Sequence, residues 1–235
     1  MGARRVGRQV TEGSWIEPGL QRVGILGGTF DPIHYGHLAV AEEVAEALGL
    51  EKILFVPAAR PPHKLDEDVT PAEDRATMVA LAIAGNPAFG LCRIELERKG
   101  PSYTADTLEQ LADEAARQGV ARELHFILSA DTLAEFRTWR TPERVLAAAH
   151  LVVVPRPGAP APSLEWALAQ IPEAAAAGPA LRIRCVDTVR LATSSTEIRA
   201  RAAAGCSIRY LVPPDVEAYV RDHRLYRSED ASRTT

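Results

Sequence analysis

Short apolar segments alternate with helical patterns along most of this chain, and no other feature constrains its fold as strongly. Six segments rich in β-branched and other apolar residues cover 22–26, 52–57, 89–96, 123–128, 150–155 and 181–186. Their near-continuous apolar character is typical of parallel strands that are buried on both faces of a sheet. Strands that alternate with helices through right-handed crossovers predict an α/β fold with a doubly wound, mostly parallel sheet.

Helix signals lie between the predicted strands. Apolar residues recur at spacings of three and four over 38–48, which predicts an amphipathic helix. Residues 70–73 read Thr-Pro-Ala-Glu and predict a capping box with proline at the first helical position, and a second Thr-Pro pair begins at Thr141. Gly119 and Gly205 stand where helices are expected to end.

The length and composition predict one large globular domain. The chain has 235 residues, of which 46% are hydrophobic and 25% are charged. We expect a single domain over 22–227, a disordered N-terminal extension over 1–21 and a polar C-terminal tail over 228–235. The sequence leaves open whether the protein forms a homo-oligomer.

The net charge and the cysteine content limit which binding partners and which cellular compartment we expect for this protein. The net charge of −4 gives no general attraction to nucleic acid or to a membrane surface. No stretch approaches the roughly 18 apolar residues of a membrane span. The three cysteines, Cys92, Cys185 and Cys206, lie far apart in the sequence and form no metal-binding or disulfide pattern, which favours a reducing cytoplasm.

The residues with the most distinctive chemistry follow the predicted strands. In a doubly wound sheet, ligands bind beyond the carboxyl ends of the strands, where the strand order reverses. The loops at those ends hold residues 27–37, 58–64, 129–131, 156–158 and 193–199. This clustering predicts that several loops build one site at the same edge of the sheet.

The loop after the first strand reads GGTFDPIHYGHL over 27–38. Its two glycines allow the backbone to approach a ligand, but the G-x-G-x-x-G spacing of a dinucleotide-binding loop is absent. His34 and His37 lie at the predicted helix start, where free N–H groups attract an anion and imidazoles can donate hydrogen bonds to phosphoryl oxygens. The alternatives are a helix cap beside a space-filling ring, or a zinc site, for which no further cysteine or histidine cluster completes a ligand set.

Residues 193–199, which read TSSTEIR, are a second candidate for phosphate binding. Ser194 and Glu197 by themselves predict only a well-capped helix. Hydroxyl groups and the guanidinium of Arg199 at a helix start also suit a triphosphate, because the guanidinium makes planar, charge-assisted contacts. The spacing alone leaves both interpretations open.

Three single residues carry similar alternatives. Lys64 is a cation after a proline-rich loop, and it is either solvated or a phosphate ligand. Asp131 either caps a helix or accepts hydrogen bonds from ribose hydroxyls. Trp139 either belongs to the core or stacks on an aromatic base.

Taken together, these segments resemble a known enzyme family. GGTFDPIHYGHL and SSTEIR are similar to the two motifs of the H-x-G-H nucleotidyltransferase superfamily. RPPHK, GPSYTADTL and YLVPPDVEAYVRDHRLY are similar to bacterial nicotinate-nucleotide adenylyltransferases within it, and the match runs from Val23 to Tyr226. The resemblance implies a Rossmann-like nucleotidyltransferase fold and transfer of AMP from ATP to nicotinate mononucleotide, giving deamido-NAD and pyrophosphate in NAD biosynthesis. It also implies Mg²⁺, held mainly by the ATP phosphates, and direct in-line attack without a covalent intermediate.

The resemblance assigns roles to individual residues. His34 and His37 match the catalytic pair that binds the ATP phosphates and stabilises the transition state. The other residues matched to ATP binding are Gly28, Thr29, Phe30, Asp131, Ser195, Thr196 and Arg199. The residues matched to the mononucleotide substrate are Lys64, Tyr103, Thr104 and Trp139.

Two positions depart from the family pattern, and three rival functions remain. Ser129 stands where the family often has glycine, and Thr193 replaces a common apolar residue. The rivals are an adenylyltransferase or cytidylyltransferase for another acceptor such as phosphopantetheine, an enzyme for nicotinamide mononucleotide, and a nucleotide-sensing module without turnover. RPPHK and GPSYTADTL count against the first rival, and the presence of both histidines counts against the last.

Overall fold

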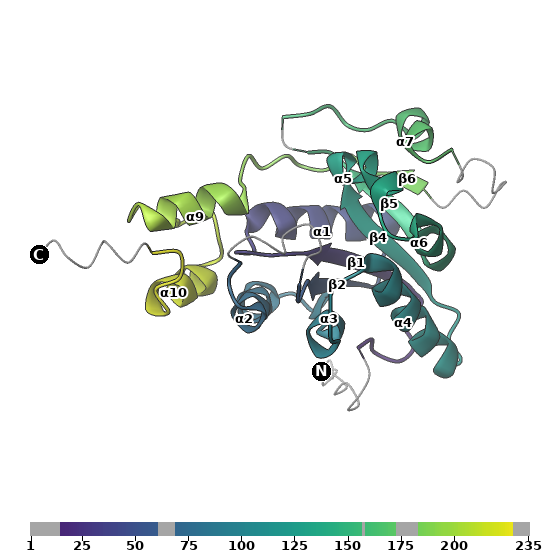
Figure 1. The fold of residues 1–235 in the computed structure, drawn as a ribbon, viewed down its shortest axis with the longest axis horizontal. Coiled ribbons are helices and arrows are strands. Elements are labelled where there is room, and N and C mark those ends of the chain that lie inside the picture. Colours follow the sequence, from purple (N-terminus) through teal and green to yellow (C-terminus); the bar gives the residue numbers. More distant parts are fainter. Residues whose placement is uncertain (1–14, 61–68, 157, 173–182, 228–235) are drawn as a thin grey trace, which may run out of the picture.

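The computed structural model describes residues 15–60, 69–156, 158–172 and 183–227 (Figure 1). Its centre is a six-stranded sheet with the order β3-β2-β1-β4-β5-β6, in which every neighbouring pair is parallel. The strands are β1 (Arg22–Gly28), β2 (Lys52–Pro57), β3 (Phe89–Leu91), β4 (Glu123–Ser129), β5 (His150–Val154) and β6 (Ile183–Cys185). The predicted doubly wound, parallel α/β fold is therefore confirmed.

Helices cover both faces of the sheet. One apolar cluster packs α1 (Tyr35–Leu48) and α2 (Ala72–Ile83) against one face. The other cluster packs α4 (Thr104–Arg117), α5 (Ala130–Ala134), α6 (Pro142–Ala148) and α7 (Leu164–Gln170) against the opposite face. Successive strand residues enter different clusters, as Ile25 and Leu26 do in β1, because side chains alternate across a strand. This double burial explains the near-continuous apolar character of the strand segments.

The strand order reverses between β1 and β4. The chain leaves β1 through α1 toward β2, and it returns from β3 through α4 to β4 on the other side of β1. The connections that leave the carboxyl ends of β1 and β4 therefore run in opposite directions along the sheet and leave a crevice there, as in other doubly wound sheets. The short helix η2 (Phe136–Thr138) follows α5 after β4.

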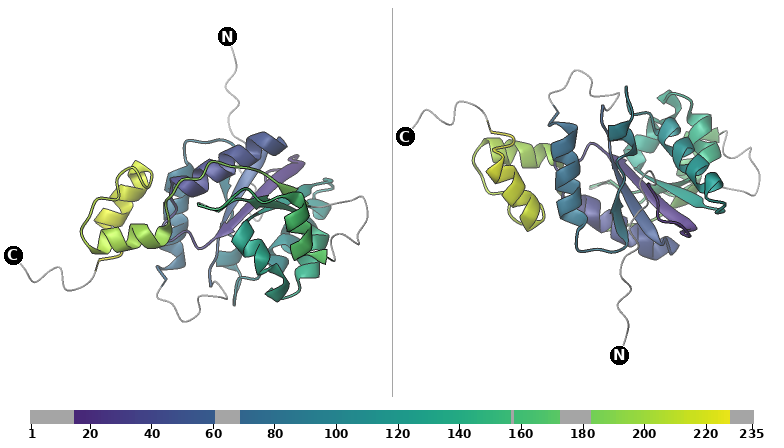
Figure 2. Two further views of the ribbon diagram at one scale, coloured as in Figure 1. Left: turned by 90° about the horizontal axis from the view of Figure 1, so that it is seen from above. Right: turned by 90° about the horizontal axis from the view of Figure 1, so that it is seen from below.

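Two C-terminal helices, α9 (Ser195–Ala203) and α10 (Pro214–Asp222), lie together at one end of the molecule (Figures 1 and 2). Ile198, Val216 and Val220 join the apolar cluster on the face of α1 and α2. The Tyr219 hydroxyl donates a 2.7 Å hydrogen bond to Asp74 Oδ1 on α2. The two C-terminal helices thus pack beside α1 and α2, the helices that follow β1 and β2.

Two local predictions were wrong. Residues 89–96 do not form one strand, because β3 ends at Leu91 and α3 (Ile94–Glu97) follows. This helical turn buries Ile94 and places the Glu95 carboxylate where the Thr107 hydroxyl donates to it at 2.7 Å. Thr70 does not cap α2 with its side chain, because Pro71 is the N-cap and makes no side-chain cap bond.

The packed part of the chain begins before the expected boundary at residue 22. Ile16 is only 1% exposed, and Trp15 and Leu20 pack against the core. The Trp15 and Ile16 N–H groups donate to the buried carboxylate of Glu114 on α4, which explains why this segment joins the domain. Residues 1–14 and 228–235 lie outside the described residues. None of the described helices has both the length and the apolar character that crossing a membrane requires.

Candidate active site

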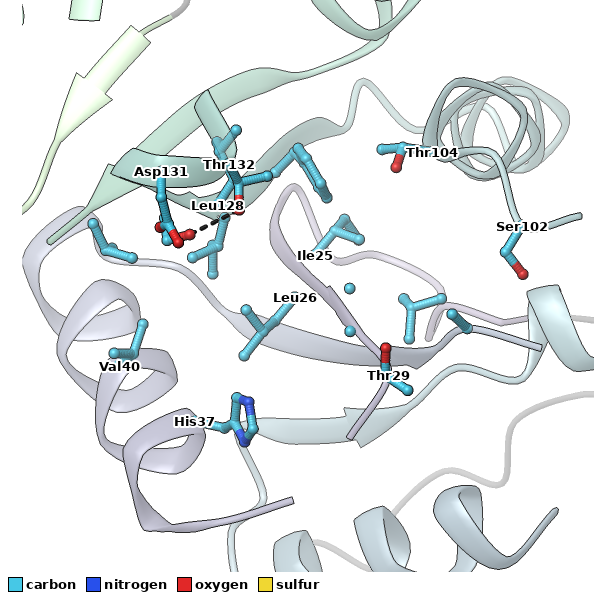
Figure 3. A pocket seen from close by; sticks show the side chains of 18 of the residues that line it. Ile25, Leu26, Thr29, His37, Val40, Ser102, Thr104, Leu128, Asp131 and Thr132 are labelled. Atoms are coloured by element: carbon cyan, nitrogen blue, oxygen red, sulfur yellow. Dashed lines mark hydrogen bonds between the residues drawn. The ribbon is translucent and has the colours of Figure 1, made fainter. Parts of the chain in front are cut away.

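A cavity of about 880 Å³ opens at the carboxyl ends of β1 and β4. Figure 3 shows the His37 ring reaching into it from α1, with Asp131 and Thr132 across the cavity and Ser102 and Thr104 toward the other end. The sequence-predicted residues that line the cavity are Gly28, Thr29, His34, His37, Tyr103, Thr104, Asp131 and Trp139. The structure therefore brings together segments that follow β1, precede α4 and follow β4.

His34 and His37 cap the start of α1 with their ring nitrogens. The Gly36 N–H donates to His34 Nδ1 at 3.1 Å, and the His34 N–H donates to His37 Nδ1 at 3.2 Å. The two rings stack with their centroids 3.8 Å apart. Part of the alternative interpretation, a helix cap, is thus correct, but both histidines take part in the cap and both also line the cavity.

The caps determine which ring nitrogen carries the proton. A ring nitrogen that accepts a hydrogen bond from a backbone N–H has no proton of its own, so each neutral imidazole is protonated at Nε2. Burial lowers the pKa of His34 to about 4 and lowers the pKa of His37 well below its usual value, with a further contribution from His34. At neutral pH the pair therefore presents two uncharged Nε2–H donors.

The lowered pKa of His34 makes the folded state sensitive to acid. His34 is only 6% exposed, so its protonated form is disfavoured in the folded protein and not in the unfolded chain. We expect the free energy of unfolding to decline as the pH falls from about 6.5 to about 4, by an amount on the order of 3 kcal/mol from this residue. Urea unfolding at several pH values measures the decline.

The control for this prediction is His34→Asn, which keeps a side-chain acceptor at the N-cap but removes the titrating group. Its unfolding free energy should depend less steeply on pH over the same range. An equally steep dependence in both proteins would contradict the assignment to His34.

Gly36 lies between the two histidines, where a side chain would crowd the ring of His34. A Cβ atom at Gly36 would lie 3.0 Å from both Cε1 and Nδ1 of His34. Neither atom can retreat without weakening the cap, since His34 Nδ1 accepts from Gly36 itself. The ring position of His34 thus favours glycine at position 36.

Four of the predicted ATP-binding residues do not line the cavity: Phe30, Ser195, Thr196 and Arg199. Phe30 is buried, has a φ of 51° and packs its ring edge-on against His37 at 5.1 Å. Ser195 Oγ donates to Pro32 O at 2.9 Å, and Arg199 Nη1 donates to Asp31 O at 2.8 Å. The start of α9 therefore holds the backbone of the first loop.

The Asp31 side chain, which belongs to this loop, and Arg75 on α2 tie the loop to other segments. The buried Asp31 carboxylate accepts from the Tyr226 hydroxyl at 2.7 Å and from the Thr70 N–H at 3.2 Å. The guanidinium of Arg75, a residue that is only 1% exposed, donates to Thr29 O at 2.7 Å, Thr70 O at 2.8 Å and Ala59 O at 3.4 Å. Burial lowers the pKa of Arg75, while Asp31 opposes that shift.

Beyond β4, the cavity carries charged and hydroxyl groups. Arg156, which follows β5, forms a 3.3 Å ion pair with Asp131 Oδ2, and both side chains are largely exposed. Ser129, one of the two departures from the family pattern, shares a 2.8 Å hydrogen bond with the Thr132 hydroxyl. This end of the cavity thus offers a carboxylate, an arginine and hydroxyls.

The other end is lined by aromatic side chains. The Trp139 ring lies 5.2 Å from that of Phe136 and 6.1 Å from that of Phe126, so it is held against the core while it lines the cavity. Tyr103 is the N-cap residue of α4 and makes no side-chain cap bond. Burial raises the pKa of Glu95, which lies behind Ser102 in the cavity wall.

Known proteins match this chain over most of its length. The family model described as Cytidylyltransferase-like matches residues 25–201. A "Probable nicotinate-nucleotide adenylyltransferase" of Symbiobacterium thermophilum is 45% identical over 209 residues, or 88% of this chain and 96% of the relative. A protein of the same description from a Roseiflexus species is 46% identical over 207 residues, or 87% of this chain and 98% of the relative.

The chain belongs to the cytidylyltransferase-like family and, within it, to the nicotinate-nucleotide adenylyltransferases. The resemblance seen in the sequence is thereby confirmed. A solved structure, the nicotinic acid mononucleotide adenylyltransferase of Plasmodium falciparum complexed with NaAD, has the same fold with a TM-score of 0.69. It is 19% identical, and the alignment covers 88% of this chain and 97% of that one.

Several residues around this adenylyltransferase cavity have no role in the sequence-based assignment: Asp31, Arg75, Glu95, Arg140, Arg156 and Tyr226. Arg156 had a usable signal, since it directly follows a strand of a parallel sheet. Arg75 had none, because a lone arginine in a helical pattern reads as a surface residue. Lys64, the remaining predicted substrate residue, lies outside the described residues.

Proposed function

We propose that this chain transfers the AMP group of ATP to nicotinate mononucleotide and releases pyrophosphate, which yields deamido-NAD for NAD biosynthesis. The proposal is supported by relatives described as probable nicotinate-nucleotide adenylyltransferases, because this chain matches nearly the whole length of each. Among the described residues, the observation that carries the chemistry is the pair of neutral Nε2–H donors on His34 and His37 at the start of α1.

Those donors suit a direct phosphoryl-type transfer. An oxygen of the mononucleotide phosphate forms a bond to the α-phosphorus, and the bond from that phosphorus to the bridging β-phosphate oxygen breaks. The electron pair leaves with pyrophosphate, so charge grows on phosphate oxygens that the Nε2–H groups and the α1 N-terminus can stabilise. The attacking phosphate is already anionic and needs no general base.

The two ends of the cavity suit the two substrates. We place the adenosine near Asp131, where the carboxylate can accept from ribose hydroxyls, and the nicotinate ring beside Trp139, Tyr103 and Thr104. The α4 N-terminus also lies at this end, and its first N–H groups favour an anionic substituent such as the ring carboxylate. Ser195, Thr196 and Arg199 stay assigned to the triphosphate, next to the loop whose backbone accepts from Ser195 and Arg199.

Magnesium enters the proposal with ATP. The described residues include no group of three or more His, Cys, Asp or Glu side chains that could hold a metal ion. We assign Mg²⁺ to the ATP phosphates, whose charge it neutralises, as the family resemblance implies. A cytoplasmic location is likewise proposed; it agrees with the free thiols of Cys92, Cys185 and Cys206.

The test supplies purified protein with ATP, Mg²⁺ and one acceptor, and it measures pyrophosphate release together with the dinucleotide product. The acceptors are nicotinate mononucleotide, nicotinamide mononucleotide and phosphopantetheine. We expect a clear preference for the nicotinate form. Faster turnover of phosphopantetheine, equal use of the nicotinamide form, or ATP binding without turnover would each replace the proposal by a different function.

A further inference from the structure

Arg140 places a positive charge at the aromatic end of the cavity. It directly follows Trp139, is exposed, and lines the same cavity as Tyr103 and Trp139. Its guanidinium carbon lies 4.7 Å from the centroid of the Tyr103 ring, a cation–π contact. The ring therefore holds the guanidinium at the cavity wall without neutralising its charge.

No described carboxylate forms an ion pair with Arg140, unlike the other arginine of the cavity. Arg156 is paired with Asp131 at 3.3 Å. Besides Asp131, two described carboxylates line the cavity: Glu135, which is exposed, and Glu95, which is buried and accepts from the Thr107 hydroxyl at 2.7 Å. The charge of Arg140 is thus available to a ligand that enters between Tyr103 and Trp139.

We propose that the Arg140 side chain is a specificity-determining residue, which selects a ring with a carboxylate over the same ring with a carboxamide. The inference rests on the proposed function. The pyridinium ring of either mononucleotide carries one positive charge. A carboxylate substituent cancels that charge and can accept from a guanidinium, whereas a carboxamide leaves the ring cationic beside a second cation. Arg140 attracts the carboxylate form and repels the carboxamide form, and both effects raise the ratio of kcat/KM for the two substrates.

The experiment compares wild type with Arg140→Gln, which removes the charge but keeps a polar side chain of similar reach. Steady-state rates are measured with nicotinate and nicotinamide mononucleotide at saturating ATP. We expect the kcat/KM ratio of the two acceptors to fall roughly five- to tenfold, mainly through a higher KM for the nicotinate form. The KM for ATP should not change.

Three further variants separate charge from structure. Arg140→Lys should keep most of the preference, and Arg140→Glu should lower it further than glutamine does. Arg137→Gln removes a nearby exposed arginine that does not line this cavity, and it should leave the ratio unchanged. Raising the salt concentration should reduce the wild-type ratio and have little effect on that of Arg140→Gln.

The two proposals fail in different ways. If wild-type protein turns over neither mononucleotide, the proposed function is wrong. If wild type prefers the nicotinate form but Arg140→Gln and Arg140→Glu, folded as judged by circular dichroism, keep the same ratio, the function stands and the role of Arg140 is wrong.

Discussion

Replacing His37 with alanine should lower kcat by about a hundred- to a thousandfold, the loss typical of one donor to a developing oxyanion. The substitution removes one of the two Nε2–H donors and also the acceptor for the His34 N–H. Pyrophosphate release with ATP and nicotinate mononucleotide measures the rate, and circular dichroism shows whether the fold persists.

Two matched variants separate the two roles of this ring. Asparagine carries an acceptor near the position of Nδ1 and can keep the cap, but it does not reach the position of Nε2. Glutamine can place an N–H donor near that tip position. We expect His37→Gln to retain more activity than His37→Asn, and His37→Asn to be the more stable of the two. Activity of His37→Asn close to wild type would disprove a donor role for Nε2–H.

Replacing Arg75 with methionine should lower the free energy of unfolding by roughly 2–4 kcal/mol, which corresponds to roughly 5–10 °C in Tm for a chain of this length. Methionine fills similar space but leaves the carbonyls of Thr29, Thr70 and Ala59 without their buried donor. Because Thr29 lines the cavity, kcat/KM should fall as well. Thermal unfolding and steady-state rates are the measurements.

Arg117→Met is the control, since Arg117 is an exposed arginine near the end of α4. It should change stability by about 0.5 kcal/mol or less. Arg75→Lys keeps a charge but not the forked donors, so its stability should lie between those of wild type and Arg75→Met. An Arg75→Met protein as stable and active as the Arg117→Met control would show that the three carbonyls do not need this residue.

The layout of the sheet was predictable because burial on both faces leaves a strong sequence pattern. Residues 52–57 form β2 with the expected bounds. The strand predicted over 89–96 was too long, because buried apolar residues such as Cys92 and Ile94 are equally compatible with a strand and with a helical turn. What decides between them is the buried contact of Glu95 with Thr107 on α4, which no local pattern contains.

The candidate site was predictable where function uses consecutive residues. His34, Gly36 and His37 signal a phosphate site within one motif, but their tautomers follow only from the hydrogen bonds of the caps. The side chains that hold this loop, Arg75 and Tyr226, come from other parts of the chain and resemble ordinary residues of their helices and turns. Contacts over such sequence separations depend on the completed fold.

The hydrogen bond from Tyr226 to Asp31 joins residues that are 195 positions apart. The loop that contains Asp31 can therefore make this contact only after the chain has been synthesised as far as Tyr226. Both histidines and every strand of the sheet leave the ribosome before Tyr226 does. Until then the Asp31 carboxylate has no phenol donor, and the loop between β1 and α1 has fewer restraints than in the folded protein. The loop that carries His34 is therefore made well before it acquires all its contacts, so a nascent chain can build its sheet before this loop is fully held in place.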